Sequence, residues 1–97
     1  MQHLKGQELQ SSDVRPNLKQ LALPGCNTRL FSAQAGCMVD SHPHERAEEV
    51  FLLAGRLRLN DAILEPGDMY RVEPGETHDA EALEDCRFLV MNYPQGA

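Results

Sequence analysis

The sequence lacks any long apolar run, since its longest one covers only Val50 to Ala54. A membrane-spanning helix needs about 20 such residues, so no membrane association is expected. An apolar segment of the kind that secretion signals carry is missing near the N-terminus. Heptads and long amphipathic helical windows are missing too, because proline and glycine recur too often for a long helix.

Basic residues are scarce, with 9 lysines and arginines against 15 acidic residues and a net charge of −6. No basic stripe could neutralise phosphates, so nucleic acid is not an expected partner. The three cysteines, Cys26, Cys37 and Cys86, are an odd number, and none belongs to a CxxC pair. They are expected to be free thiols in a reducing compartment, which predicts a cytoplasmic protein.

Short apolar segments separated by turn residues fill the chain from Asn17 onward, as in all-β barrels and sandwiches. Asn60-Asp61 tolerates positive φ and predicts a tight hairpin, and Pro66-Gly67 suits a type II turn. Residues 1–16 are polar and only weakly periodic, so we predict an N-terminal arm there and one β-barrel domain over residues 17–97. The expected strands are Leu18–Leu23, Thr28–Gln34, Cys37–His44, Glu48–Ala54, Arg56–Leu59, Ala62–Leu64, Met69–Val72, His78–Ala82 and Arg87–Asn92.

Three histidines and a glutamate form the most informative pattern in the chain. His42 and His44 stand one residue apart, which places them on the same side of a strand but not of a helix. Glu48 follows four positions after His44, and His78 opens another segment after a glycine-rich turn. Each residue alone would be read as an ordinary surface residue. Together they predict a nitrogen- and oxygen-rich site for a divalent transition metal.

The spacing of these residues resembles the first motif of the cupin superfamily. That motif runs from a glycine through five residues to HxH, then through three or four residues to a glutamate, and through six residues to a glycine. Gly36, His42, His44, Glu48 and Gly55 follow one another with this spacing.

A second cupin motif is matched less fully, between Gly67-Asp68 and His78. The second motif has Pro-x-Gly, two residues and then the histidine. Here Pro74-Gly75 stands before His78, so the proline is displaced by one position relative to that motif. Ala82 stands where the family often has asparagine. Eleven residues separate Gly55 from Gly67, the short spacing of small single-domain cupins.

The resemblance implies an antiparallel jelly-roll β-barrel, open at one end, with one divalent metal held by His42, His44, Glu48 and His78. These donors suit Fe, Mn, Ni, Co, Cu or Zn better than Ca or Mg. Glu49 is an alternative to Glu48, because strand alternation lets only one of them face the cavity. The six residues between Glu48 and Gly55 favour Glu48.

Four protein ligands would leave open positions on a six-coordinate ion, as Lewis-acid or oxygenase chemistry requires. We therefore predict a small metal-dependent cupin, an enzyme of oxygenase type that acts on a small organic molecule. A non-catalytic ligand-binding or sensor module is one alternative, and an isomerase or decarboxylase is another, because the fold does not fix the reaction. A homodimer is expected because so small a domain buries a limited core.

Side-chain alternation gives further expectations around the site. Met38 and Asp40 share the parity of the two histidines and are expected to line the cavity, whereas Cys37 is expected in the core. Of Tyr70 and Arg71, one faces inward, and an inward arginine would favour an anionic ligand.

Overall fold

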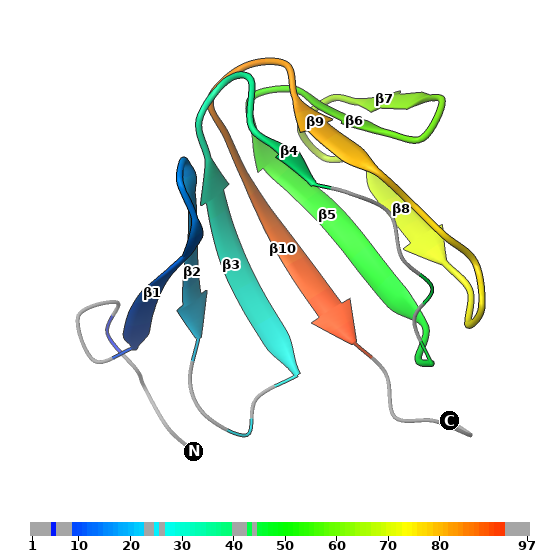
Figure 1. The fold of residues 1–97 in the computed structure, drawn as a ribbon, viewed down its shortest axis with the longest axis horizontal. Coiled ribbons are helices and arrows are strands. Elements are labelled where there is room, and N and C mark those ends of the chain that lie inside the picture. The colour runs from blue at the N-terminus through cyan, green and yellow to red at the C-terminus, as the bar shows by residue number, and fades with distance from the viewer. Residues whose placement is uncertain are drawn as a thin grey trace.

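The computed structural model describes residues 5, 9–22, 25, 27–39, 43 and 45–92 of the chain. All of its regular structure is β-strand, and all pairings are antiparallel, so the all-β prediction is confirmed (Figure 1). In the described residues there is no helix that could span a membrane. The strands are β1 (Gln10–Arg15), β2 (Leu18–Ala22), β3 (Thr28–Ala33), β4 (Met38–Val39), β5 (Glu48–Ala54), β6 (Leu57–Leu59), β7 (Ala62–Leu64), β8 (Met69–Val72), β9 (Ala80–Ala82) and β10 (Cys86–Asn92).

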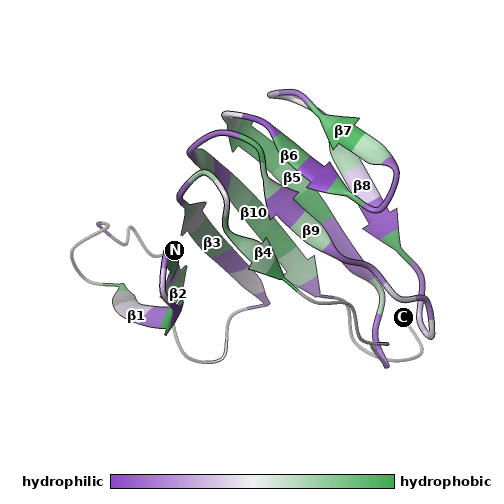
Figure 2. Ribbon diagram, turned by 45° about the horizontal axis from the view of Figure 1, so that its top comes forward, coloured by the Kyte–Doolittle hydropathy of each residue, from purple (hydrophilic) through white to green (hydrophobic). Residues whose placement is uncertain are grey.

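Two sheets enclose one hydrophobic core. The larger has six strands in the order β1-β2-β3-β10-β5-β8, and the smaller has four in the order β4-β9-β6-β7. Phe31 and Leu52 from the larger sheet share the core cluster with Leu57 and Leu59 from the smaller one. In Figure 2, hydrophobic and hydrophilic bands alternate along several strands, because alternate side chains face the core and the solvent. This two-sheet arrangement is consistent with a jelly roll.

The predicted strands agree with the structure where apolar alternation is bounded by turn residues. Glu48–Ala54, Ala62–Leu64 and Met69–Val72 are confirmed residue for residue as β5, β7 and β8. The Asn60-Asp61 hairpin is confirmed as well, with Asn60 at a φ of 50°. The segment predicted as His78–Ala82 forms a strand only from Ala80, so His78 lies in the preceding loop.

The predicted segment Cys37–His44 is described only in part. Its strand residues are Met38–Val39, which pair with β9. Asp40, His42 and His44 lie outside the described residues.

Strand β1 lies within the segment predicted as an arm. Its residues Gln10 to Arg15 pair with β2 at the edge of the larger sheet, and the turn between the two strands has Asn17 at a φ of 70°. The predicted boundary at residue 16 therefore falls inside a β-hairpin. The division into arm and barrel stays a prediction.

Candidate metal centre

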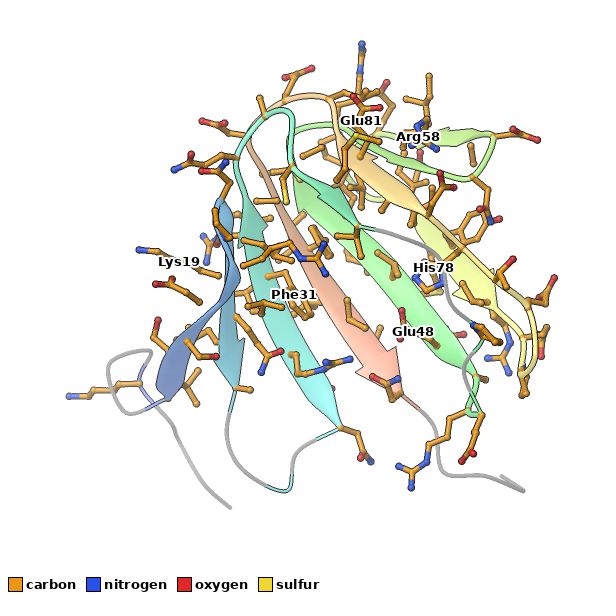
Figure 3. All side chains as sticks on the ribbon, in the orientation of Figure 1. Lys19, Phe31, Glu48, Arg58, His78 and Glu81 are labelled. Atoms are coloured by element: carbon orange, nitrogen blue, oxygen red, sulfur yellow. The ribbon has the colours of Figure 1, made fainter. Side chains whose placement is uncertain are left out.

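Glu48 and His78 meet between the two sheets, at the end of the core where β5 begins. Glu48 is the first residue of β5, and His78 lies two residues before β9. Their exposed fractions are 5% and 9%. His78 Nε2 lies 3.5 Å from Glu48 Oε1 (Figure 3). A carboxylate and an imidazole are therefore held close together in a largely water-excluded place.

Strand register decides which acidic residue faces inward. Glu48 pairs with the buried Val72, whereas Glu49 pairs with Arg71 on the opposite face of the same two strands. Glu49 Oε2 accepts a hydrogen bond of 3.0 Å from Arg71 Nη1. Of the two glutamates left open by the sequence, Glu48 is the inward one. Its role as a metal ligand stays a prediction.

The same register settles the orientation of Tyr70 and Arg71. Tyr70 pairs with Val50 and packs against the core, so it is the inward residue. Arg71 is exposed and donates to Glu73 as well as to Glu49. These hydrogen bonds, that to Glu73 first, raise the pKa of Arg71 above its ordinary value. Arg71 therefore belongs to an outer ion-pair cluster.

Asn60 fixes the loop that carries His78. Its backbone N–H donates to Asp79 O at 3.0 Å, and its Oδ1 accepts from the Asp79 N–H at 3.2 Å. Its Nδ2 donates to the Tyr70 hydroxyl at 3.1 Å and to Thr77 O at 3.4 Å. The residues on both sides of His78 are thus tied to one turn residue. Sequence reasoning found Asn60 as a turn former and missed this positioning role.

Replacing Asn60 should therefore weaken metal binding without unfolding the protein. Asn60→Gly keeps the backbone free to adopt positive φ but removes all three side-chain hydrogen bonds. We expect metal affinity to fall about 10- to 100-fold, the usual loss when a residue that orients a ligand is removed. Chelator competition measures the affinity.

Asn17→Gly is the matched control for this variant, because Asn17 is the other described asparagine with positive φ and lies in the β1–β2 turn. Its metal affinity should equal that of the unmodified protein. Equal affinity for both variants would show that Asn60 does not position His78.

The distance between Glu48 and His78 can be compared with the distance between two ligands of one metal ion. At 3.5 Å the two atoms are farther apart than in a good hydrogen bond, which is about 2.7–3.2 Å long. Two ligands with metal bonds of about 2.1 Å lie about 3.0 Å apart at a right angle and about 3.4 Å apart at a tetrahedral angle. The pair therefore fits shared coordination of one ion.

The other two predicted ligands, His42 and His44, lie outside the described residues. Among the residues that are described, no group of three histidine, cysteine or acidic side chains could hold a metal. The structure thus brings together Glu48 and His78, and the four-ligand set stays a prediction.

Met38 does not line the site as its parity predicted. It is 56% exposed, and its neighbour Val39 packs against the core instead. The alternation along β4 is therefore opposite to the one expected. Asp40, which shared the prediction, lies outside the described residues.

The cysteines that the structure describes lie in the hydrophobic core. Cys37 and Cys86 are free and buried in the core, as expected for Cys37, and Cys26 lies outside the described residues. Burial, with smaller effects from Cys37 and Asp85, raises the pKa of Cys86 to about 11. Its thiol is therefore protonated at neutral pH and is neither a ready nucleophile nor a ready ligand.

A separate hollow of about 840 Å³ lies beside the β1–β2 hairpin, where its lining includes Arg15, Lys19 and Arg87. Neither Glu48 nor His78 lines it. It is therefore distinct from the candidate metal centre.

The model of the ChrR cupin-like domain family matches residues 14–95 of this chain. No curated protein matches it. Among solved structures, an RmlC-like cupin from Shewanella frigidimarina has a TM-score of 0.81 at 17% identity, over 99% of this chain and 95% of the other. The polyketide cyclase RemF from Streptomyces resistomycificus has a TM-score of 0.79 at 19% identity, over 100% and 82% of the two chains.

A third similar structure is the complex of Rhodobacter sphaeroides SigE with the anti-sigma ChrR. The match has a TM-score of 0.76 at 21% identity and covers 92% of this chain but 51% of the other. At these identities the three structures establish the fold alone.

Proposed function

This chain belongs to the ChrR cupin-like domain family, and we propose that it is a small metal-dependent cupin. The observation that carries the proposal is the buried Glu48–His78 pair, whose 3.5 Å separation suits two ligands of one ion. His42, His44, Glu48 and His78 would hold one divalent transition metal, which could be Fe, Mn, Ni, Co, Cu or Zn.

In this proposal the protein is an enzyme of oxygenase type that takes a small organic molecule. The bound metal would supply Lewis acidity and open positions for exogenous ligands. Glu48 is held by the hydrogen bond of 3.2 Å from Asn92 Nδ2, and the His78 loop is held by Asn60. Both side chains are thus oriented before any ligand arrives, and their burial keeps bulk water from competing.

The oxygenase reaction can be tested after anaerobic reconstitution with Fe(II). We expect the reconstituted protein to bind nitric oxide, a surrogate for dioxygen, and to consume oxygen with a catecholic, enolic or diketone compound. Glu48→Gln should abolish oxygen uptake while circular dichroism shows an intact fold. Electron paramagnetic resonance and an oxygen electrode provide the two readouts. Nitric oxide binding without oxygen uptake for any of these compounds would contradict the oxygenase reaction.

A second candidate is a non-catalytic ligand-binding or sensor module. The family match favours this sensor module, because the family is described as the ChrR cupin-like domain. The similar structure is a complex of SigE with the anti-sigma ChrR. An isomerase or decarboxylase is a further alternative, and the similarity to a polyketide cyclase illustrates that this fold is compatible with other chemistry. A sensor should bind its ligand without turnover, and the oxygen electrode separates it from an oxygenase.

We also propose that the protein is cytoplasmic and forms a homodimer. The two buried free thiols support a reducing compartment. An apolar row supports the dimer, because it crosses the outer face of the larger sheet through successive cross-strand pairs. The row consists of Leu21, Leu30, Leu89, Phe51 and Met69. A two-fold contact places the same patch on both subunits, which suits an uncharged row.

Phe51→Glu should therefore convert the dimer into a monomer, because it places a charge within the apolar row. Ile63→Glu is the matched control, since Ile63 is 56% exposed on the smaller sheet. Light scattering at micromolar concentration measures the mass. A monomer mass for the unmodified protein would contradict the dimer.

A further inference from the structure

A line of polar side chains leads from the candidate metal centre across three strands. Asn92 at the end of β10 donates from Nδ2 to Glu48 Oε2 at 3.2 Å and accepts at Oδ1 from Arg29 Nη2 at 2.7 Å. Arg29 lies on β3, and its partner in the register is the buried Val90. Its side chain therefore starts from the same inner face of the larger sheet as Glu48.

The guanidinium of Arg29 is held in one orientation. Its Cζ lies 5.3 Å from the centroid of the Phe31 ring, which itself stacks on Phe88 at 5.4 Å. Such a contact attracts the cation to the ring face. With the hydrogen bond to Asn92, it fixes a planar donor group that is separated from Glu48 by the Asn92 side chain alone.

The charge of Arg29 is compensated differently from that of the outer arginines. Arg56, Arg58 and Arg71 each form ion pairs with two carboxylates. Among the side chains that the structure describes, no carboxylate forms such a pair with Arg29. A partly buried guanidinium that is oriented in this way, with N–H groups besides the one bonded to Asn92, matches the planar geometry of a carboxylate.

We infer that Arg29 is the anchor of a carboxylate subsite next to the candidate metal centre, so that the molecule taken by this protein is a small organic acid. The inference rests on the proposed function, because the other end of the acid would lie at the metal. Strands β3 and β5 are separated only by β10, so their backbones are about 10 Å apart, and their inward side chains shorten that span. An acid of a few carbon atoms would bridge it.

Arg29 could alternatively act only through Asn92, as a positioning residue for Glu48. The two roles differ in what they change. A positioning residue alters metal affinity and acid affinity together, whereas an anchor alters acid affinity alone.

The test uses the full chain loaded with Co(II), whose visible absorption reports ligands that bind the metal. Acetate, malonate and succinate are titrated, with malonamide as the uncharged probe, and calorimetry gives the affinities. We expect malonate or succinate to bind more tightly than acetate or malonamide. Arg29→Gln should weaken binding of that diacid about 10- to 100-fold, the usual loss for a hydrogen bond to a charged group. Its Co(II) affinity should stay within about threefold, well below the 10- to 100-fold loss of a residue that orients a ligand.

Arg71→Gln is the matched control, because it removes an arginine from the outer face of the same sheet, and it should bind the diacid like the unmodified protein. Unchanged diacid affinity in Arg29→Gln would overturn the inference. Parallel loss of Co(II) and diacid would overturn it too, in favour of the positioning role. If Arg29→Gln fails to fold, Arg29→Lys keeps the charge without the planar donor group. That variant should bind the diacid more weakly, and unchanged affinity would again overturn the inference.

The outcome for the unmodified protein separates this inference from the proposed function. Binding of Co(II) without binding of any acid would overturn the subsite and leave the metal centre standing. Failure to bind Co(II) would overturn the proposed function. The same acids would then be titrated into the metal-free protein. Weaker binding by Arg29→Gln would support the subsite, and unchanged binding would overturn it.

Discussion

His78→Ala should leave a folded protein whose affinity for its divalent metal is lower by more than the roughly 100-fold that loss of a supporting residue costs. The substitution removes a donor that is 9% exposed and lies 3.5 Å from Glu48 Oε1. A donor from the solvent cannot readily take its place, because the site is buried. Elemental analysis of protein purified without chelator and competition with a chelator measure the effect.

Thermal unfolding gives an independent readout of the same substitution. A ligand that binds only the native state stabilises it, by about 2.7 kcal/mol when present at 100 times its Kd. The unmodified protein should therefore melt at a lower temperature after chelation, and His78→Ala should melt at one temperature with or without chelator. His3→Ala is the control histidine, because His3 belongs to neither motif. Metal content in His78→Ala equal to that of the unmodified protein would remove His78 from the site.

Much of the fold could be predicted because local patterns encode it. Strands β5 and β8 alternate between core and solvent and end at glycine or proline turns, so their bounds were correct to the residue. Strand β1 was missed because its residues Ser11 to Arg15 are all exposed. Without a buried position, these five residues show no apolar alternation, and they depend instead on the pairing of β1 with β2.

The chemistry of the candidate site could be predicted from the sequence, but the contacts between its residues could not. The spacing of Glu48 and His78 within the motifs indicated a metal centre, but their contact joins residues 30 positions apart (48 to 78). Arg29 and Asn92 were not singled out, because they are 63 positions apart and meet only through the β3–β10 register. Cross-strand register depends on the packing of the whole sheet and cannot be deduced from the local alternation of apolar and polar side chains.

Gly55→Ala should destabilise the fold more than any other single methyl group added at the described glycines. Gly55 follows β5 at a φ of +86°, which alanine adopts only with strain. A Cβ built there would lie 2.7 Å from Cys86 Cβ and 2.8 Å from Cys86 Cα, and it would overlap the carbonyl oxygen of Asp85. The neighbours are mostly backbone at the start of β10, which cannot move without shifting the central strand.

Strain and overpacking together should cost Gly55→Ala about 3 to 5 kcal/mol in the free energy of unfolding. Gly67→Ala is the matched control, because Gly67 has a φ of +96° but a Cβ there would have no atom within 4 Å. It carries the strain without the collision and should cost about 1 kcal/mol. Urea unfolding of the metal-free proteins measures both values and keeps metal binding out of the comparison.

Equal losses in the two variants would show that backbone strain alone explains the glycine at position 55. A larger loss in Gly55→Ala would instead show that close packing explains why the first cupin motif ends in a glycine. The chain passes so close to Asp85 and Cys86 that only a residue without a side chain fits. Since small domains are stable by only about 5–15 kcal/mol, this one methyl group could remove much of that margin. The glycine would then support the metal centre indirectly, by letting β5 and β10 lie side by side and so bringing Asn92 within reach of Glu48.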